Sequence, residues 1–173
     1  MEELVILVDA SDREVGQAPK LAAHRQGILH RAFSVFLFDT GGRLLLQRRA
    51  HAKYHSGGLW SNTCCGHPRP GEGLVDAAQR RLAEEMGVTC ALRPVGSFTY
   101  RARVGDLEEH ELDHVLVGRH EGDPRPAASE VDAWRWVAPA EAVAELAAGP
   151  ERFTPWFARA LDLATNPEDR GNR

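Results

Sequence analysis

Imidazoles and carboxylates occur in the sequence at positions where a folded chain could bring them together. His24 and His30 lie six residues apart across a glycine break, and His67 lies in a Cys-Gly-His-Pro segment. Glu109 and Glu111 are two residues apart at the start of a predicted strand, so both carboxylates point to one face. Such ligands suit a borderline divalent cation such as Mn²⁺ or Zn²⁺. Any one of them alone is more often an ordinary surface or hydrogen-bonded residue, because the chain has 8 histidines in all.

A second candidate for chemistry is a predicted helix over residues 74–86. Apolar side chains recur there every four positions, and Gly87 follows the last turn, where glycine is favoured. Arg81 and Glu85 are four residues apart and share a helix face. They either form an exposed ion pair, contributing about 0.3 kcal/mol, or bind a diphosphate, with Glu85 holding Mg²⁺ and an arginine the phosphate oxygens. One protein carboxylate is enough for Mg²⁺ when phosphates supply further ligands.

The elements that must position these groups are mixed strands and helices. Residues 32–38 and 43–49 predict a hairpin around the glycine-rich turn 39–42, and 51–58 predict a loop. Further strands are expected at 4–9, 95–102, 111–118 and 134–137, with a short extended stretch at 59–65. Further helices are expected at 19–24, 139–148 and 154–164, the last with Thr154 as its N-cap. Because strands and helices do not alternate regularly, an α+β sandwich is favoured over a doubly wound fold.

Length and composition set the class of protein. The chain has 173 residues, 43% of them hydrophobic and 27% charged, which suits one globular domain. Its net charge of -4 argues against general nucleic-acid binding, which needs a concentrated basic face. No apolar stretch reaches the roughly 20 residues of a membrane span, and acidic Glu2 and Glu3 do not suit a signal peptide. Three cysteines, Cys64, Cys65 and Cys90, do not form a disulfide scaffold, so we expect a reducing cytoplasm.

The segment from Gly66 to Val88 resembles the Nudix box, a loop–helix–loop signature of diphosphate chemistry. One position departs from that pattern. The family has glutamate immediately after the arginine Arg80, and this chain has Arg81. The departure removes a carboxylate and adds a cation, which suits binding a diphosphate better than activating water for hydrolysis.

Several other segments resemble the type 1 isopentenyl diphosphate isomerases. They are 20–24, 59–62, the cysteine motif 62–68, 100–102, 109–111 and 153–156. The resemblance runs from about Leu7 to Trp156 and implies a single α+β domain, with a Nudix-like mixed β-sheet sandwiched between helices. We expect this domain to cover residues 1–165 and residues 166–173 to form a disordered tail. The implied reaction moves a double bond, converting isopentenyl diphosphate to dimethylallyl diphosphate through a tertiary carbocation, in isoprenoid precursor biosynthesis.

The resemblance also assigns residues to roles. It implies proton transfer at Cys65 and Glu111, with Tyr100 beside the carboxylate and Trp156 facing the carbocation. It implies diphosphate binding by four basic residues, Lys20, Arg49, Lys53 and Arg81. It implies one Mn²⁺ or Zn²⁺ in a site of three histidines and two glutamates, His24, His30, His67, Glu109 and Glu111. Mg²⁺ is implied to arrive with the substrate at Glu85 and the Cys65 carbonyl.

Three functions remain open at this point. The first is the isomerase, the second a Nudix hydrolase of a nucleoside or other diphosphate, and the third a catalytically silent diphosphate-binding module. Adjacent Cys64 and Cys65 face opposite ways in extended chain, so only one enters the site, and we expect Cys64 to be inert. Which of Cys65 and Glu111 gives the proton is left open, as is the identity of the bound metal. We expect a small-molecule diphosphate as partner, no nucleic acid or membrane, and a monomer or weak dimer.

Overall fold

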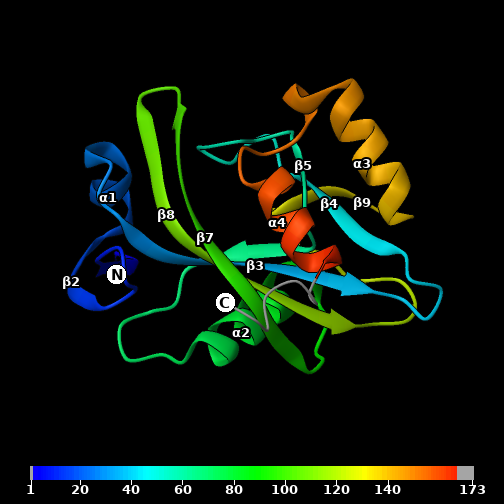
Figure 1. Ribbon diagram of the computed structural model, residues 1–173, viewed down its shortest axis with the longest axis horizontal. Coiled ribbons are helices and arrows are strands. Elements are labelled where there is room, and N and C mark those ends of the chain that lie inside the picture. Colours follow the sequence, from blue (N-terminus) through cyan, green and yellow to red (C-terminus); the bar gives the residue numbers. More distant parts are fainter. Residues whose placement is uncertain (1, 167–173) are drawn as a thin grey trace.

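The computed structural model describes residues 2–166, which form one nine-stranded mixed sheet with helices against it (Figure 1). The strands are β1 (Leu4–Val8), β2 (Glu14–Pro19), β3 (His30–Phe38), β4 (Leu44–Arg49), β5 (Trp60–Ser61), β6 (Cys64–Gly66), β7 (Leu92–Val104), β8 (Leu107–Arg119) and β9 (Val131–Val137). The helices are α1 (Lys20–Gln26), α2 (Leu74–Met86), α3 (Pro139–Ala148) and α4 (Phe157–Thr165), with a 3-10 turn at Pro150–Arg152. The predicted single-domain α+β fold is confirmed.

Strand β3 organises the sheet because it has different partners along its two edges. One edge pairs in parallel with β8, from His30 opposite Glu111 to Phe38 opposite Arg119. The other edge meets β1, then β6, then β4 in succession. The predicted hairpin therefore holds only next to its turn, since β4 leaves β3 after one pair and runs beside β9. This divergence lets β6 enter and places Cys65 opposite Ser34.

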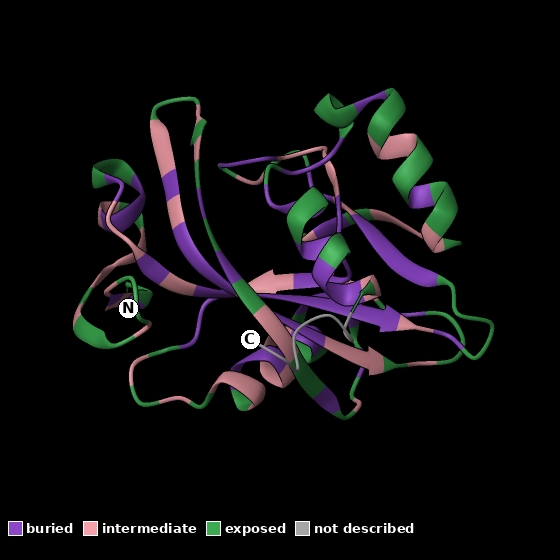
Figure 2. Cartoon of the chain, viewed as in Figure 1, coloured by how far each residue is buried: buried purple, intermediate pink, exposed green. Residues whose placement is uncertain are grey.

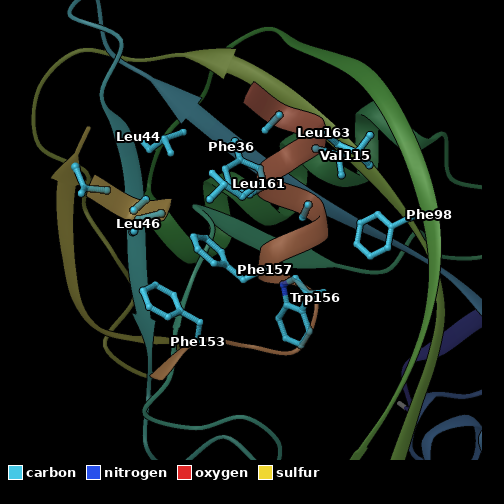
Figure 3. Packing of buried hydrophobic residues seen from close by; sticks show 14 of the residues in the cluster. Phe36, Leu44, Leu46, Phe98, Val115, Phe153, Trp156, Phe157, Leu161 and Leu163 are labelled. Atoms are coloured by element: carbon cyan, nitrogen blue, oxygen red, sulfur yellow. The ribbon is translucent and has the colours of Figure 1, made fainter. Parts of the chain in front are cut away.

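Side chains alternate along β3 between two hydrophobic clusters, one on each side of the sheet. Phe33, Val35 and Leu37 face the cluster that contains the buried residues of α2. Phe36 faces the other cluster, which α4 covers with residues that include Phe157 (Figure 3). Both faces of the strand are thus buried, as the purple colour along β3 shows (Figure 2). This explains why residues 35–38 of the strand form a continuous apolar run rather than an alternating pattern.

Helix α2 has the bounds that its pattern predicts. Gly87 has φ +63° and ends the helix in the left-handed conformation. Helix α3 likewise begins at Pro139 as expected.

The expected start of α4 is wrong. This helix begins at Phe157 after an uncapped Trp156, and the Thr154 hydroxyl instead hydrogen-bonds Ser61 at 2.9 Å. Two further differences concern strands: β2 has no counterpart among the predicted strands, and the predicted strands 95–102 and 111–118 lie within the longer strands β7 and β8 of one hairpin.

Most of the predicted tail, residues 167–173, lies outside the described residues. Within residues 2–166, none of the helices has the length and apolar character needed to span a membrane.

Candidate active site

Three histidines and one glutamate from separate elements converge on one point. His24 comes from α1, His30 from the start of β3, His67 from the chain after β6, and Glu111 from β8. All four are buried, and their potential ligand atoms lie within 4.8 Å of one another. Glu111 Oε1 is 2.9 Å from His67 Nε2, 3.4 Å from His30 Nε2 and 3.6 Å from His24 Nε2.

The local backbone explains how the first two histidines come together. Gly27 ends α1 with φ +61°, a left-handed conformation that residues with a Cβ rarely adopt, so the tight return into β3 favours glycine. The parallel register of β3 and β8 then sets His30 directly opposite Glu111. His30 Nδ1 donates to the Ile28 carbonyl at 2.8 Å, which leaves Nε2 of the neutral ring free as a ligand.

The residues of this cluster fit a divalent metal ion. His24 Nε2, His30 Nε2 and Glu109 Oε1 are buried and have no hydrogen-bond partner among residues 2–166. Buried polar atoms without partners are rare in proteins, and several on one cluster indicate a missing ligand. Burial acts to raise the pKa of Glu111, but the three surrounding imidazoles outweigh it and hold the pKa well below its usual range. Imidazoles with a charged carboxylate are donors that Mn²⁺ and Zn²⁺ accept.

Glu109, the fifth predicted ligand, lies beside the four-residue cluster. Its Oε1 is 2.9 Å from His55 Nε2, and its Oε2 accepts a hydrogen bond from the Tyr100 hydroxyl at 3.1 Å. Burial and the neighbouring Glu111 raise the pKa of Glu109 to about 7. His55 was not singled out from the sequence, because it lies in a loop where spacing carries no signal. Burial and Arg49 lower the pKa of His55 to about 3, so its ring is neutral.

Tyr100 connects the two glutamates. Its hydroxyl is 2.6 Å from Glu111 Oε2 as well as 3.1 Å from Glu109 Oε2. The antiparallel register of β7 and β8 places Tyr100 opposite Glu111, which accounts for this contact. Burial, together with Glu111, raises the pKa of Tyr100 well above its usual range, so the hydroxyl keeps its hydrogen.

A cavity of about 340 Å³ opens beside this cluster. Cys65, His67, Glu111 and Trp156 line it, together with the buried carboxyl group of Asp113. The wall also includes the four predicted diphosphate-binding residues and the predicted Mg²⁺ ligand: Lys20, Arg49, Lys53, Arg81 and Glu85. The structure therefore gathers residues from α1, β4, α2 and β8 and the loops between β4 and β5 and before α4 around one hollow.

Asn62 holds two groups of this cavity in place, the Trp156 indole and the Cys65 thiol. Its Oδ1 accepts hydrogen bonds from Trp156 Nε1 at 3.0 Å, Cys65 Sγ at 3.2 Å and the Ser61 hydroxyl at 2.8 Å. Burial raises the pKa of the Cys65 thiol to about 12, so the sulfur carries a proton. Cys64 points away into the cluster under α2 and is fully buried. Asn62 lies in the cysteine motif 62–68, but the sequence analysis assigns it no role.

The basic residues differ in what they contact. Lys20 is 3.1 Å from Glu3, Lys53 pairs with Glu130, and Arg81 pairs with both Glu85 and Glu130. Arg49 has no carboxylate partner among residues 2–166.

The Arg49 guanidinium lies 5.5 Å from the centre of the Trp156 ring. Its Nε has no hydrogen-bond partner in the described part of the chain, and the residue is 4% exposed. A buried cation with a free donor at a cavity wall is suited to an anionic ligand.

The fold and the α2 segment are those of a known class. The NUDIX domain family matches residues 28–157. The fold is similar to that of DR0079 from Deinococcus radiodurans, with a TM-score of 0.78, 24% identity, and coverage of 92% of this chain and 97% of that one. It is also similar to a MutT protein from Methanosarcina mazei, with a TM-score of 0.64, 20% identity, and coverage of 78% and 91%. The fold and site thus define a NUDIX domain protein.

Comparison with curated relatives narrows this class of protein to one family. The chain is 56% identical over 168 residues to the isopentenyl-diphosphate Delta-isomerase of Burkholderia multivorans, covering 96% of each chain. It is 53% identical to the isopentenyl-diphosphate Delta-isomerase of Serratia proteamaculans, covering 100% of this chain and 98% of the relative. The chain belongs to the isopentenyl-diphosphate Delta-isomerase family of NUDIX domain proteins. The resemblance described from its sequence motifs is confirmed.

Proposed function

We propose that the protein isomerises isopentenyl diphosphate to dimethylallyl diphosphate. The observation that carries this proposal is the shared cavity, which has Cys65 and Glu111 in its wall and four basic residues around it. The names of its relatives point to the same reaction. A hydrolase has no need of a buried thiol and a tryptophan at the same hollow, so the hydrolase alternative is disfavoured.

The reaction requires a proton to be added at the terminal carbon of the alkene and another to be removed from C2. Cys65, which retains its hydrogen, and Glu111, which is held ionised by its histidines, are the two proton-handling groups. Tyr100 assists at the carboxylate through its 2.6 Å hydrogen bond. Asn62 keeps the thiol in place.

A carbocation forms between the two proton transfers, and the cavity must stabilise it. The Arg49 guanidinium lies 5.5 Å from the centre of the Trp156 ring, which supports a ring face that is accessible to a cation. A desolvated cation over a tryptophan face is stabilised by about 2 kcal/mol. Trp156 is 4% exposed, and its Nε1 hydrogen bond to Asn62 fixes the orientation of the ring. Exclusion of water protects the cation from capture.

Two metal ions are part of the proposal. His24, His30, His67 and Glu111, with Glu109 beside them, would hold Mn²⁺ or Zn²⁺, whose charge would set the acidity of Glu111. Glu85 is buried at the cavity wall, where it would hold Mg²⁺ on the diphosphate with the Cys65 carbonyl. The phosphate oxygens are bound by the four basic residues, Lys20, Arg49, Lys53 and Arg81.

Proton NMR of isopentenyl diphosphate with Mg²⁺ and the protein tests this function. Appearance of the dimethylallyl isomer is the expected result. Release of inorganic phosphate without that isomer, measured by phosphorus NMR of the same sample, would identify a hydrolase instead. An unchanged substrate spectrum, with the protein folded and metal supplied, would leave only a binding module.

The remaining expectations from the sequence belong to the same proposal. The catalytic domain covers residues 1–165, acts in the cytoplasm as a monomer or weak dimer, and takes a small-molecule diphosphate rather than nucleic acid or membrane as its partner. Size-exclusion chromatography with light scattering tests the monomer, and a truncation after residue 165 that keeps activity tests the domain boundary.

A further inference from the structure

Glu130, at the turn before β9, joins two of the basic residues at the cavity. A single carboxylate oxygen, Oε2, accepts hydrogen bonds from Lys53 Nζ and from Arg81 Nη2, the latter at 3.2 Å. Lys53 belongs to the loop between β4 and β5, whereas Arg81 belongs to α2. The three side chains are 26%, 16% and 19% exposed, and all three residues line the cavity.

Glu130 and its neighbour Asp132 also hold the loop between β4 and β5 that carries Lys53. The Glu130 carbonyl accepts a hydrogen bond from the Ala50 amide at 2.9 Å. Two residues further on, Asp132 accepts a hydrogen bond from the His51 amide at 3.1 Å. Loop residues 51–58 contain no helix or strand, so these contacts supply the support that a ladder of sheet hydrogen bonds would otherwise give.

The turn that carries Glu130 is also attached to α2. The Arg125 and Ala127 amides donate to the Met86 and Glu85 carbonyls, each at 2.8 Å. These carbonyls belong to the last turn of the helix, whose carbonyl groups lack partners within the helix. Glu130 thus belongs to a segment that is hydrogen-bonded to α2, the helix that carries Arg81.

Two like charges at one wall repel each other, and a lysine on a loop has many side-chain conformations to lose when it binds an anion. A carboxylate between them offsets the repulsion and restricts the lysine before the ligand arrives. We propose that Glu130 is a positioning residue for diphosphate binding, which holds Lys53 and Arg81 in the geometry that the phosphate oxygens meet. This inference rests on the proposed function for the identity of the anion, but its test needs no turnover.

The test measures binding of inorganic pyrophosphate, with Mg²⁺ present, by isothermal titration calorimetry. Glu130→Gln keeps the shape of the side chain and removes its charge. We expect its dissociation constant to rise about tenfold, equivalent to about 1.4 kcal/mol. The matched control is Glu145→Gln, because Glu145 forms a similarly exposed ion pair with Arg135 away from the cavity. The control should stay within about twofold of the unmodified protein.

Kinetics separate positioning from chemistry. With isopentenyl diphosphate, Glu130→Gln should raise KM by about the same tenfold and leave kcat within about twofold. Tighter pyrophosphate binding would overturn the proposal, because Glu130 would then compete with the anion for the two cations. Unchanged binding, or a fall in kcat at constant KM, would overturn it equally. Pyrophosphate binding without isomerisation would instead refute the proposed function and leave the role of Glu130 standing.

A double-mutant cycle covers the case in which Glu130→Gln disturbs the loop as a whole. In a Lys53→Met background, Glu130 has lost one of its two partners, so Glu130→Gln should weaken pyrophosphate binding less than in the unmodified protein. Equal losses in the two backgrounds would show that Glu130 does not act through Lys53. Melting temperatures of all variants, compared with Glu145→Gln, report whether the fold is intact.

Discussion

Replacing Asn62 with alanine tests how the cavity holds its reactive groups. Asn62 is fully buried, and its Oδ1 accepts hydrogen bonds from Ser61, Cys65 and Trp156. The Ser61 hydroxyl can turn to Thr154, 2.9 Å away, and a thiol is a weak donor, so these two losses are small. Trp156 Nε1 loses its acceptor in a buried site.

An unsatisfied buried donor costs about 1–3 kcal/mol. The Asn62 amide group also donates to the Cys64 carbonyl at 2.7 Å and the Val35 carbonyl at 3.2 Å, and these bonds are lost as well. We therefore expect Asn62→Ala to lower the free energy of unfolding by about 2–4 kcal/mol. With a denaturant dependence of about 2 kcal/mol per molar urea, the unfolding midpoint should fall by about 1–2 M.

Urea unfolding followed by circular dichroism measures this change. The matched control is Asn166→Ala, because Asn166 makes an exposed side-chain bond to Asp162 and should change stability by less than about 0.5 kcal/mol. Trp156→Phe removes the indole donor, so Asn62→Ala should cost at least about 1 kcal/mol less in that background. A midpoint within error of the unmodified protein, or equal costs in both backgrounds, would falsify the argument that Asn62 holds Trp156.

Four further predictions concern Cys65, Glu111, the metal site and the Glu72–Arg80 ion pair. Cys65→Ser should reduce kcat by at least about a thousandfold with an unchanged melting temperature, and near-normal turnover would remove Cys65 from the chemistry. Glu111→Gln should lose both turnover and part of the bound metal, as measured by mass spectrometry; normal metal content at a normal rate would contradict its double role. Adding Mn²⁺ or Zn²⁺ to chelator-treated protein should raise its melting temperature, by an amount equivalent to about 2.7 kcal/mol at a hundredfold excess over Kd, and His67→Gln should reduce this gain. Arg80 holds the pKa of Glu72 below its usual range, so their pairing should stabilise the fold above the unfolded pKa of Glu72 and lose that effect as pH falls. Glu72→Gln should therefore reduce the fall in the free energy of unfolding on the acid side of its pH profile. An unchanged slope would show that the pair contributes nothing.

The elements that the sequence predicted well are those with a strong local signal. Helix α2 combines apolar residues at regular spacing with Gly87 at its end, so its bounds follow from periodicity and capping. Strand β2 (Glu14–Pro19) was missed because it is an exposed edge strand that ends in proline. The start of α4 was misplaced because the Thr154 side chain hydrogen-bonds Ser61 of β5, a tertiary contact that overrides a local capping preference.

The site was predictable only where the residue types themselves are unusual. The three histidines and Glu111 could be grouped because a family pattern joins segments that are far apart in sequence. His55, Asn62 and Glu130 lie outside regular secondary structure, where no periodicity indicates which way a side chain points. The separation of β3 from β4, which brings Cys65 to the cavity, depends on pairing between distant strands and has no local signature.

A crystal structure with a non-reactive five-carbon diphosphate bound would show directly where the substrate lies. We expect the hydrocarbon to lie in the 340 Å³ cavity, with Cys65 Sγ and a Glu111 oxygen in contact with it, within about 4 Å, from opposite sides. A hydrocarbon that lies outside this cavity, or that touches only one of these two residues, would contradict this expectation.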